Sequence, residues 1–483
     1  MIGQAVKLVD DIVGDGIESA VRAHHRRRLR RIGWERALDA NGGLWCAGDP
    51  PPRPGNDVSV FIDGEEALPA LAEALEGAQS HVFLAGWYFS PGFALRRDGQ
   101  PSALGDVLKG LSKRGVDVRV LMWAGAPLPL FTPSRADART MRNALVQTSG
   151  VQCALDDRER PMHCHHEKIV VVDDELAFVG GIDLTHLDGD RFDARAHPLR
   201  GGVGWHDAAA RIRGPAVADV ADHFRLRWRE VTREDLGASP VPDAAGDVEL
   251  QVVRTVPERV YDALPRGDFR ILEAYTRALR SAQRFIYLES QFLWSPEIVE
   301  LLREKLQSPP TPDFRVVVLL PAKPNNGEDD TKGQLGELAE ADPDDERLLA
   351  CTLYARAGGE RMPVYVHAKI GIVDDEWLTL GSANLNEHSL FNDTEMNLVF
   401  RDPGLARDTR ERLWAEHLEL ERDEIAGLAP VEVVDRYWQP IAREQKNRLQ
   451  HDHPLTHRLV RLPHVSRRAR RLLGPIQSLL VDG

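Results

Sequence analysis

The sequence has few cysteines, and their spacing excludes a disulfide framework. Cys46, Cys153, Cys164 and Cys351 are scattered over 483 residues, and no Cys-x-x-Cys pair occurs. Small secreted domains that depend on disulfides have a much higher cysteine density. We therefore expect a chain that folds without disulfides in a reducing compartment, the cytoplasm.

Long apolar runs are missing as well. A membrane-spanning helix needs about 20 consecutive apolar residues, and no stretch of this sequence comes near that length. The apolar start of the chain is broken by Asp10 and Asp11 and is not followed by a small-residue cleavage site, so we expect no secretory signal. Any contact with a membrane is expected to be peripheral.

The charge balance is acidic. The 75 Asp and Glu residues outnumber the 61 Lys and Arg residues and give a formal net charge of -14, which argues against a protein dedicated to coating nucleic acid. Basic residues nevertheless gather in the segment 21–36 and again after residue 457. Such clusters are typical of contact with an anionic membrane surface, and equally of a solvated helix face packed on its own domain. The sequence leaves both interpretations open.

The apolar pattern predicts the same order of strands and helices twice. In the first half, strands are expected over 58–62, 81–88 and 116–122, with helices over 65–75 and 104–113. In the second half, strands are expected over 248–253, 285–289 and 314–320, with helices over 270–282 and 296–306. A repeat near 200 residues indicates two related α/β domains, each with a central mixed sheet flanked by helices.

The seam between the two domains is expected in the small-residue and proline stretch 237–246. We predict a basic N-terminal extension over 1–55, a first domain over 56–235, a second domain over 236–430 and a basic C-terminal extension over 431–483. An acidic segment, 325–346, follows the apolar strand of the second half. It is expected to be either a lid over a site or a solvated loop.

Each half carries the pattern His-x-Lys-x4-Asp-x6-Gly-(Gly/Ser). Its members are His166, Lys168, Asp173, Gly180 and Gly181 in the first half, and His367, Lys369, Asp374, Gly381 and Ser382 in the second. Residues i and i+2 of a strand face the same way, so each histidine and its lysine are expected to project together. Lysine binds phosphate as a point charge, and histidine near neutral pH can attack or donate a proton. If the two copies meet, they supply both groups that cleavage of a phosphodiester needs.

The paired motifs resemble those of the phospholipase D superfamily, over about residues 56 to 425. The resemblance implies an active site at the pseudo-twofold interface of the two domains. It implies that His166 attacks phosphorus to form a phosphohistidine, and that His367 protonates the leaving alcohol and later activates water or an acceptor alcohol. Lys168, Lys369 and Asn384 would hold the non-bridging oxygens, whereas the first half has Asp183 in place of Asn384.

The blocks after each motif also resemble the family, and they imply that Asp207 and Glu395 hydrogen-bond the catalytic imidazoles. An exposed acid in a turn is the alternative for each. Asp173 and Asp374 lie too far along a strand from their histidines for contact, so we interpret them, with the motif glycines and Ser382, as structural. The cluster His163 to His166 matches no usual zinc spacing, and we expect no metal or other cofactor.

The amino-acid sequences of the segments Trp205–Asp207 and Gly381–Ser389 most resemble those of phospholipase D proper. The expected function is head-group cleavage of a glycerophospholipid to phosphatidic acid, with transfer to an alcohol as a further outcome. The alternatives are a cardiolipin synthase or other phosphatidyltransferase, then a nuclease-like phosphodiesterase, and last a non-catalytic membrane scaffold. We expect a phospholipid substrate, no nucleic-acid partner and a monomer.

Overall fold

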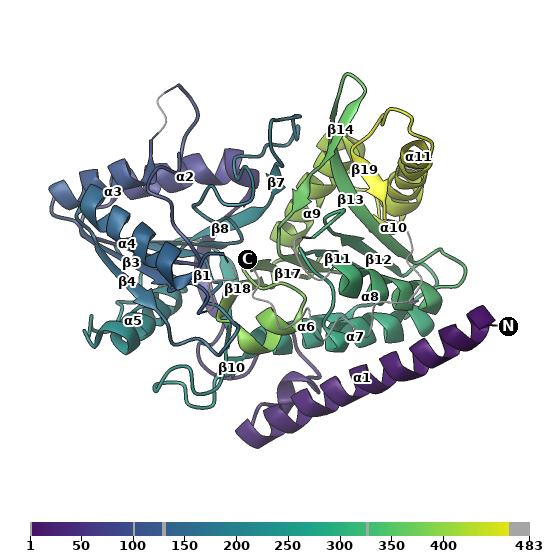
Figure 1. Ribbon diagram of the computed structural model, residues 1–483, viewed down its shortest axis with the longest axis horizontal. Coiled ribbons are helices and arrows are strands. Elements are labelled where there is room, and N and C mark those ends of the chain that lie inside the picture. The colour runs from purple at the N-terminus through teal and green to yellow at the C-terminus, as the bar shows by residue number, and fades with distance from the viewer. Residues whose placement is uncertain (1, 100–101, 128–131, 325–327, 463–483) are drawn as a thin grey trace.

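The computed structural model describes residues 2–99, 102–127, 132–324 and 328–462. Figure 1 shows its two halves side by side, with the first half mainly in blue and teal and the second in green and yellow, while the purple N-terminal helix lies under the second half. Each half has a central mixed sheet with helices packed on it. The chain is therefore a duplicated α/β protein, as the repeat of elements predicts.

The first sheet has seven strands in the order β4-β3-β2-β5-β6-β8-β1. Their bounds are β4 (Gln152–Asp156), β3 (Asp117–Trp123), β2 (His81–Gly86), β5 (Ile169–Val172), β6 (Leu176–Gly180), β8 (Ala208–Arg213) and β1 (Arg53–Ile62). The pairs β4·β3 and β3·β2 are parallel, and the remaining pairs are antiparallel.

The second sheet repeats this order as β13-β12-β11-β16-β17-β18-β9. Its strands are β13 (Leu348–Ala357), β12 (Arg315–Leu319), β11 (Phe285–Glu289), β16 (Ile370–Val373), β17 (Trp377–Gly381), β18 (Glu395–Phe400) and β9 (Val248–Val256). The edge strands β14 (Glu360–Pro363) and β19 (Leu459–Arg461) pair with β13, and β10 (Asp268–Phe269) pairs with β9. Because β1 also pairs with β9, the two sheets are joined at equivalent strands.

The helices of the first half are α2 (Asp63–Gly77), α3 (Leu104–Lys113), α4 (Arg135–Ser149) and α5 (Val217–Thr232). Those of the second half are α6 (Arg270–Ser281), α7 (Pro296–Gln307), α8 (Glu328–Ala341), α9 (Pro403–Leu418), α10 (Pro430–Val433) and α11 (Gln439–Gln450). The N-terminal helix α1 (Ile2–Ile32) lies along α7 (Figure 1). Short helical turns cover Glu35–Ala37, His388–Asn392, Arg422–Glu424 and Val434–Trp438.

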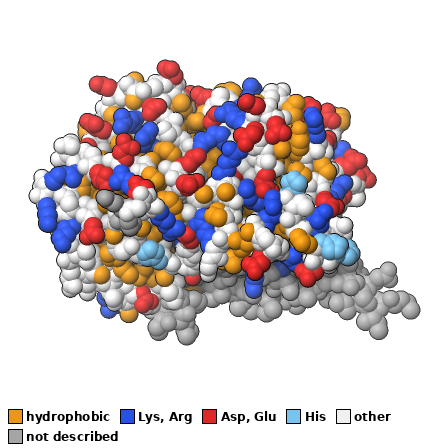
Figure 2. Space-filling view, turned by 90° about the horizontal axis from the view of Figure 1, so that it is seen from above, with side chains coloured by type: hydrophobic (Ala, Val, Ile, Leu, Met, Phe, Trp, Pro, Cys, Tyr) orange, Lys and Arg blue, Asp and Glu red, His pale blue; other side chains and the backbone are white. Residues whose placement is uncertain are grey.

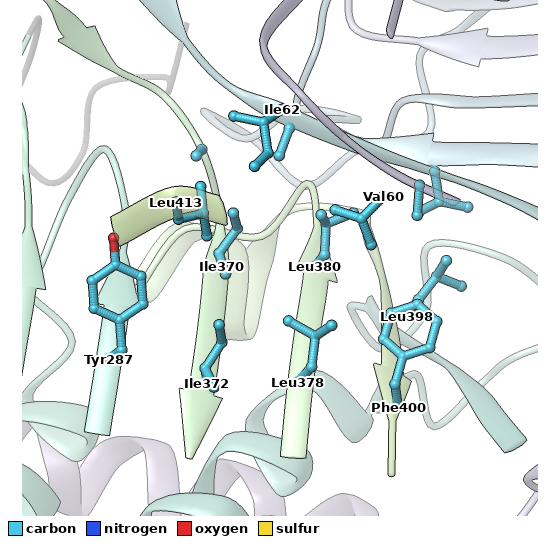
Figure 3. Packing of buried hydrophobic residues seen from close by; sticks show 14 of the residues in the cluster. Val60, Ile62, Tyr287, Ile370, Ile372, Leu378, Leu380, Leu398, Phe400 and Leu413 are labelled. Carbon is cyan, nitrogen blue, oxygen red and sulfur yellow. The ribbon is translucent and has the colours of Figure 1, made fainter. Parts of the chain in front are cut away.

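The largest apolar core lies between the two sheets and draws on both halves. Figure 3 shows Val60 and Ile62 of β1 facing Leu378 and Leu380 of β17, with Leu413 of α9 beside them. Strands that are covered on both faces are apolar along their whole length, and every residue of β11 and β16 is buried. The shared core holds the two halves in one fixed relation, and this relation sets the geometry of any site between them.

The acidic segment 325–346 is a correction to the sequence analysis, because its described part is neither a lid nor a solvated loop. Residues 328–341 form α8, which packs on α7. Leu335, Leu338 and Ala341 recur every three residues and are buried in the core of the second half. This helical stripe outweighs the acidic character of the flanking residues.

Part of the N-terminal basic cluster is used in contacts with the protein itself. Arg28 is buried and its guanidinium lies 2.7 Å from the carboxylate of Glu258, and Arg26 lies 2.5 Å from Asp39. Among the helices that the structure describes, none is both long and apolar enough to cross a membrane. The predicted domain boundaries stay a prediction, and most of the C-terminal basic cluster lies outside the described residues.

Candidate active site

The two motifs meet between the sheets. His166 and His367 each precede the same strand of their half, β5 and β16, and their ring centroids lie 6.4 Å apart. Both imidazoles and both motif lysines are buried. The structure thus brings His166, Lys168, His367 and Lys369 to one place, at the pseudo-twofold interface of the domains.

Each motif segment docks on the backbone of the opposite half. The N–H groups of His166 and Glu167 donate to the carbonyl oxygen of Thr394 at 2.9 and 3.1 Å. Those of His367 and Ala368 donate to the carbonyl oxygen of His206 at 2.8 and 3.0 Å. The sequence analysis placed each His-x-Lys on a strand, but the strands begin one residue after the lysine. The reason is this docking, which occupies the N–H groups that a sheet ladder would use.

The same contacts between the two halves place a carboxyl group beside each imidazole. His166 Nδ1 lies 3.0 Å from Glu395 Oε1, and His367 Nδ1 lies 2.6 Å from Asp207 Oδ2. Glu395 directly follows Thr394, and Asp207 directly follows His206, so one short segment holds both the backbone and the ring of the opposite motif. A carboxyl group on Nδ1 fixes the ring orientation, and in its ionised form it favours a proton on that nitrogen, which leaves Nε2 for chemistry.

The two carboxylates lie in different surroundings. Glu395 also accepts hydrogen bonds from the hydroxyls of Ser382 and Ser389, at 2.5 and 2.6 Å. Burial raises the pKa of Glu395 to about 8, although Lys168 and the two hydroxyls act in the opposite direction. Burial raises the pKa of Asp207 to about 6, and there Lys369 is the largest opposing influence.

Both lysines fold back on their own motif. Lys168 Nζ donates to the carbonyl of His166 at 2.8 Å and lies 3.4 Å from Asp183 Oδ2, and Lys369 Nζ donates to the carbonyl of His367. Burial lowers the pKa of Lys369 to about 7 even though Asp207 opposes this. Burial and the two lysine charges also hold the pKa of His367 well below its usual value. The two lysines thus place positive charge beside His367, which suits an anionic substrate.

Asn384 and its counterpart Asp183 differ in what they contact. Asn384 is fully buried, donates to Gln291 Oε1 at 3.2 Å, and its Oδ1 has no hydrogen-bond partner among the described residues. Asp183 instead lies beside Lys168. Asp183 thus lies at the site as the partner of a lysine, whereas Asn384 is linked to it through Gln291, which donates to the Tyr365 hydroxyl beside the His367 ring.

The motif aspartates lie at the far end of their strands, away from the histidines. Each accepts hydrogen bonds from three consecutive backbone N–H groups, those of Gln79, Ser80 and His81 for Asp173, and those of Gln283, Arg284 and Phe285 for Asp374. These groups precede β2 and β11, the neighbours of the motif strands. Both aspartates thus hold a loop next to the motif strand.

At three of the four small motif positions, the backbone lies so close to neighbouring atoms that a side chain would not fit. A side chain on Gly180 would come within 2.6 Å of the Ala208 carbonyl, and one on Gly181 within 2.1 Å of the Asp207 carboxylate. One on Gly381 would come within 2.3 Å of Asn397. Only the fourth position has room for a side chain, and Ser382 uses it to bond Glu395.

Sequence reasoning missed several residues around the histidines. Ser389 bonds Glu395, the Trp205 ring lies 4.4 Å from the His367 ring, and the Arg191 guanidinium lies 3.3 Å from the centre of the Trp205 ring. Trp205 directly precedes His206-Asp207, so its place near the site was open to inference. No local pattern points to Arg191. His165 lies beside the site as a buried ring 3.1 Å from Asp156.

An apolar pocket opens beside Lys168. It is lined by Leu68 and Leu71 of α2, by Phe89 and by Ile182, and it is narrow, with a cavity volume of about 40 Å³. Lys168 and Asp183 form its polar end. A phosphate held by the lysines would therefore have an apolar wall next to it.

Comparisons with known proteins agree with the duplicated arrangement. A family model described as "Phospholipase D" matches residues 74–204, and one described as "Cardiolipin synthase, PLD-like domain" matches residues 275–416. Together the two models cover more than half of the chain. A duplicated α/β fold with one such domain in each half defines the class. The chain belongs to the phospholipase D superfamily.

The chain is 26% identical over 473 residues to phospholipase D A of Dictyostelium discoideum, which covers 77% of this chain and 36% of that protein. It is 26% identical over 552 residues to phospholipase D alpha 1 of Oryza sativa subsp. japonica, which covers 76% of this chain and 66% of that protein. It thus spans about a third of the first relative and just under two thirds of the second. The crystal structure of phosphatidylserine synthase from Haemophilus influenzae shares the fold, with a TM-score of 0.52 at 12% identity over 82% of this chain and 93% of that one.

Proposed function

We propose that the chain is a phospholipase D-type phosphodiesterase that cleaves the head group from a glycerophospholipid and releases phosphatidic acid. The observation that carries this proposal is the pair His166 and His367, whose rings lie 6.4 Å apart and each bond a carboxylate of the opposite half. Two imidazoles at one phosphorus can serve as nucleophile and proton donor in a two-step displacement.

In the first step, His166 Nε2 attacks phosphorus, and the bond from phosphorus to the head-group oxygen breaks with its electron pair on oxygen. His367 gives that oxygen a proton, so that the alcohol leaves and a phosphohistidine remains. In the second step, water attacks phosphorus, gives its proton to His367 and restores His166. An alcohol in place of water gives transphosphatidylation. Two in-line displacements retain the configuration at phosphorus.

Lys168, Lys369 and Asn384 hold the non-bridging oxygens in this proposal. Ammonium groups in a buried site stabilise charge that develops on those oxygens, so the proposed chemistry is independent of a catalytic metal ion. A bound phosphodiester also adds a negative charge next to His367. This charge offsets the lysines that hold the pKa of His367 low, and it allows His367 to carry the proton that the leaving alcohol needs.

A lipid substrate is supported by the relatives and by the pocket. Both relatives described above carry the name phospholipase D. Leu68, Leu71 and Phe89 form an apolar wall in the pocket that Lys168 also lines, which suits a phosphate with an apolar group next to it. A phosphatidyltransferase is the second candidate, because one of the matching models is described as "Cardiolipin synthase, PLD-like domain" and differs from a hydrolase only in the acceptor. A nuclease-like phosphodiesterase is the third.

The test is turnover of phosphatidylcholine and phosphatidylglycerol vesicles with EDTA in the assay and ethanol as an added acceptor. We expect release of the head group and a phosphatidylethanol product, both lost in His166→Ala. The matched control is His186→Ala, an exposed histidine of the same half, which should keep full activity. If neither lipid is cleaved but plasmid DNA or bis-nitrophenyl phosphate is, the lipid assignment is wrong and the nuclease-like alternative replaces it.

We further propose a cytoplasmic monomer with peripheral contact to anionic membranes through the basic ends. Figure 2 shows basic and acidic side chains interspersed over the face seen from above. Charges of opposite sign on that face offset one another within a Debye length of about 10 Å, so the attraction would depend on the ends. The fraction of protein that sediments with phosphatidylglycerol vesicles should fall when residues 463–483 are removed. An unchanged fraction would contradict the proposal.

A further inference from the structure

A second cluster of imidazoles and carboxylates lies behind His367, and the proposed chemistry does not use it. Asp63 begins α2, His197 lies in the loop before β7 (Trp205–His206), His206 belongs to β7, and Glu416 lies on α9. All four side chains are at most 4% exposed. One nitrogen or oxygen of each lies within 4.8 Å of those of the other three.

Three buried atoms of this cluster make no well-directed hydrogen bond within the described residues, although two of them face each other as an ion pair. They are Asp63 Oδ2, His197 Nε2 and Glu416 Oε1. Glu416 Oε1 lies 3.2 Å from His197 Nε2 and 3.4 Å from His206 Nδ1. Buried polar atoms without partners are costly and rare in folded proteins. Their convergence indicates that something else completes the site.

The remaining ring nitrogen of each histidine is held by another carboxylate. His197 Nδ1 lies 2.9 Å from Asp193 Oδ2, and His206 Nε2 lies 2.9 Å from Glu289 Oε2. Asp193 is in turn paired with Arg200. A histidine whose far nitrogen bonds a carboxylate is the usual arrangement of metal-bound histidines, because the carboxylate fixes the tautomer and orients the ring.

Asp63 also has an unusual backbone. Its φ angle is 62°, in the left-handed region that residues other than glycine rarely adopt. The next residue must be small, because a Cβ on Gly64 would come within 1.9 Å of the Arg191 carbonyl. Strained backbone of this kind persists where the surrounding structure fixes it, and often at binding sites.

We propose that Asp63, His197, His206 and Glu416 bind one divalent ion of the zinc type. Two imidazoles with two carboxylates suit Zn²⁺ and its first-row neighbours, whereas Ca²⁺ and Mg²⁺ prefer oxygen ligands alone. Ligands of a tetrahedral zinc ion are separated by about 3.4 Å, and the separations of 3.2 and 3.4 Å at Glu416 match this value. His206 Nδ1 also lies 2.9 Å from Asp63 Oδ1, and the proton shared there would be released when the ion binds. Four protein ligands leave no open position, so the ion is structural and not catalytic.

The ion would fix one side of the candidate active site. Asp63 N–H donates to the carbonyl of Asp207 at 2.8 Å, and Asp207 N–H donates to Asp63 Oδ1 at 3.1 Å. Asp207 is the residue that bonds His367. Glu416 comes from the second half and the other three ligands from the first, so the ion also ties the two halves together directly behind this pair.

The primary test is the metal content of the full-length chain, purified without chelator and without a metal-affinity tag. We expect about one equivalent of zinc by mass spectrometry. After prolonged chelation, added Co²⁺ should give the strong visible absorption of a tetrahedral site. Added Zn²⁺ should raise the thermal midpoint, because a ligand that binds only the folded state stabilises it. The short EDTA exposure in the turnover assay is a separate matter, because a buried ion is released slowly.

The ligand variants are His197→Gln and Glu416→Gln, and each should weaken Zn²⁺ binding about tenfold or more. The control is Glu411→Gln on the same helix, which removes a buried carboxylate paired with Arg422 and should keep the full equivalent. All readouts are metal content, spectrum and thermal midpoint, so they are independent of whether the chain cleaves lipid.

Several results would overturn the proposal. The first is a wild-type chain without bound metal, without a Co²⁺ spectrum and without a shift of its thermal midpoint on addition of Zn²⁺. The four residues would then form a network of ion pairs that needs no metal. Stabilisation by Ca²⁺ alone would overturn the ion class. Equal loss of zinc in Glu411→Gln would show that metal retention depends on the fold and not on the four ligands. If the ligand variants do not fold, the Co²⁺ and Zn²⁺ experiments on the wild type still decide.

Discussion

The first and second halves use the same backbone frame and then diverge in their side chains. The carbonyl oxygens of Thr394 and His206 hold the two motifs in equivalent ways. His166, however, bonds a glutamate that two serine hydroxyls also contact. His367 bonds an aspartate whose other oxygen accepts from the Ala208 N–H, and its ring packs near Trp205.

The shared backbone frame therefore sets where the two histidines lie, whereas the neighbouring side chains set the surroundings of each. The pKa of Glu395 is raised to about 8 and that of Asp207 to about 6. Nucleophilic attack needs a neutral imidazole and proton donation a protonated one, and in a symmetric pair either histidine could take either state. The asymmetry therefore favours fixed roles for the two histidines.

The largest effect is expected from removal of either histidine. His166→Ala and His367→Ala should each reduce lipid cleavage by about 10³-fold or more, because one loses the nucleophile and the other the proton donor. A nitrophenyl phosphodiester has a leaving group that needs no proton, so it should restore much of the first step in His367→Ala but none in His166→Ala. Rapid-mixing measurement of nitrophenol release checks this. The opposite pattern would exchange the proposed roles.

Replacement of Glu395 and replacement of Asp207 should reduce activity with different dependences on pH. Glu395 is protonated below a pKa of about 8, and glutamine mimics that neutral form, so Glu395→Gln should cost little at pH 6 to 7 and more as the pH rises past 8. Asp207 ionises above about 6, so Asp207→Asn should cost about 100-fold already at pH 7. Profiles of kcat/KM against pH for both variants measure this. Parallel profiles would contradict the asymmetry.

A smaller effect is expected when Asn384 and Asp183, which occupy equivalent positions in the two halves, are made the same residue. Asn384→Asp copies Asp183 and brings a carboxylate to the oxygens of the substrate phosphate, so KM should rise about tenfold while kcat changes less. Asp183→Asn makes the opposite change, frees Lys168 from its partner, and should leave KM equal or lower. Steady-state kinetics on mixed vesicles compare the two. A rise of KM in both would show that Asp183 positions Lys168.

The smallest effect on activity is expected at the loop-holding aspartates. Asp173→Ala and Asp374→Ala each remove three hydrogen bonds from backbone N–H groups and should lower the free energy of unfolding by about 1–3 kcal/mol. Asp374 is buried and Asp173 only half-buried, so the second-half variant should lose more. Denaturant unfolding measures the difference, with kcat as the control. A large loss of kcat without loss of stability would contradict a structural role.

Acidification should lower the stability of the fold through protonation of Asp173. Burial raises the pKa of Asp173, but the N–H groups of residues 79–81 outweigh it and hold this pKa below its usual range. A carboxyl with a lowered folded pKa stabilises the fold above its unfolded pKa of about 3.9, and this contribution is lost as the pH falls through the folded value. Asp173→Ala should therefore lose less stability than the wild type on acidification below pH 4.

Much of the fold could be predicted because its signals are local. The helix 104–113 and the strand 285–289 agree with the structure to the residue, since both show clear apolar patterns. The segment over 325–346 was misjudged because its acidic ends hid the stripe of Leu335, Leu338 and Ala341. Local charge says little about a helix that is held by tertiary packing.

The site was less accessible to sequence reasoning. The motif identified His166 and His367, but it could not assign Glu395 to the first and Asp207 to the second, because those partners lie 229 and 160 residues away. Asp63, His197 and Glu416 have no spacing pattern at all. Only the pairing of β1 with β9 and the shared core bring such residues together.

The exchange of partners between halves has a consequence for synthesis of the chain. The N–H of His166 bonds a carbonyl of Thr394, and its ring bonds Glu395, 229 residues later. At about 5–20 residues per second on the ribosome, the first motif waits roughly ten to fifty seconds for these partners. During that interval the first sheet can form while its motif histidine still lacks its carboxylate. Any nascent chain that stops short of Glu395 is therefore expected to be folded in part and chemically silent.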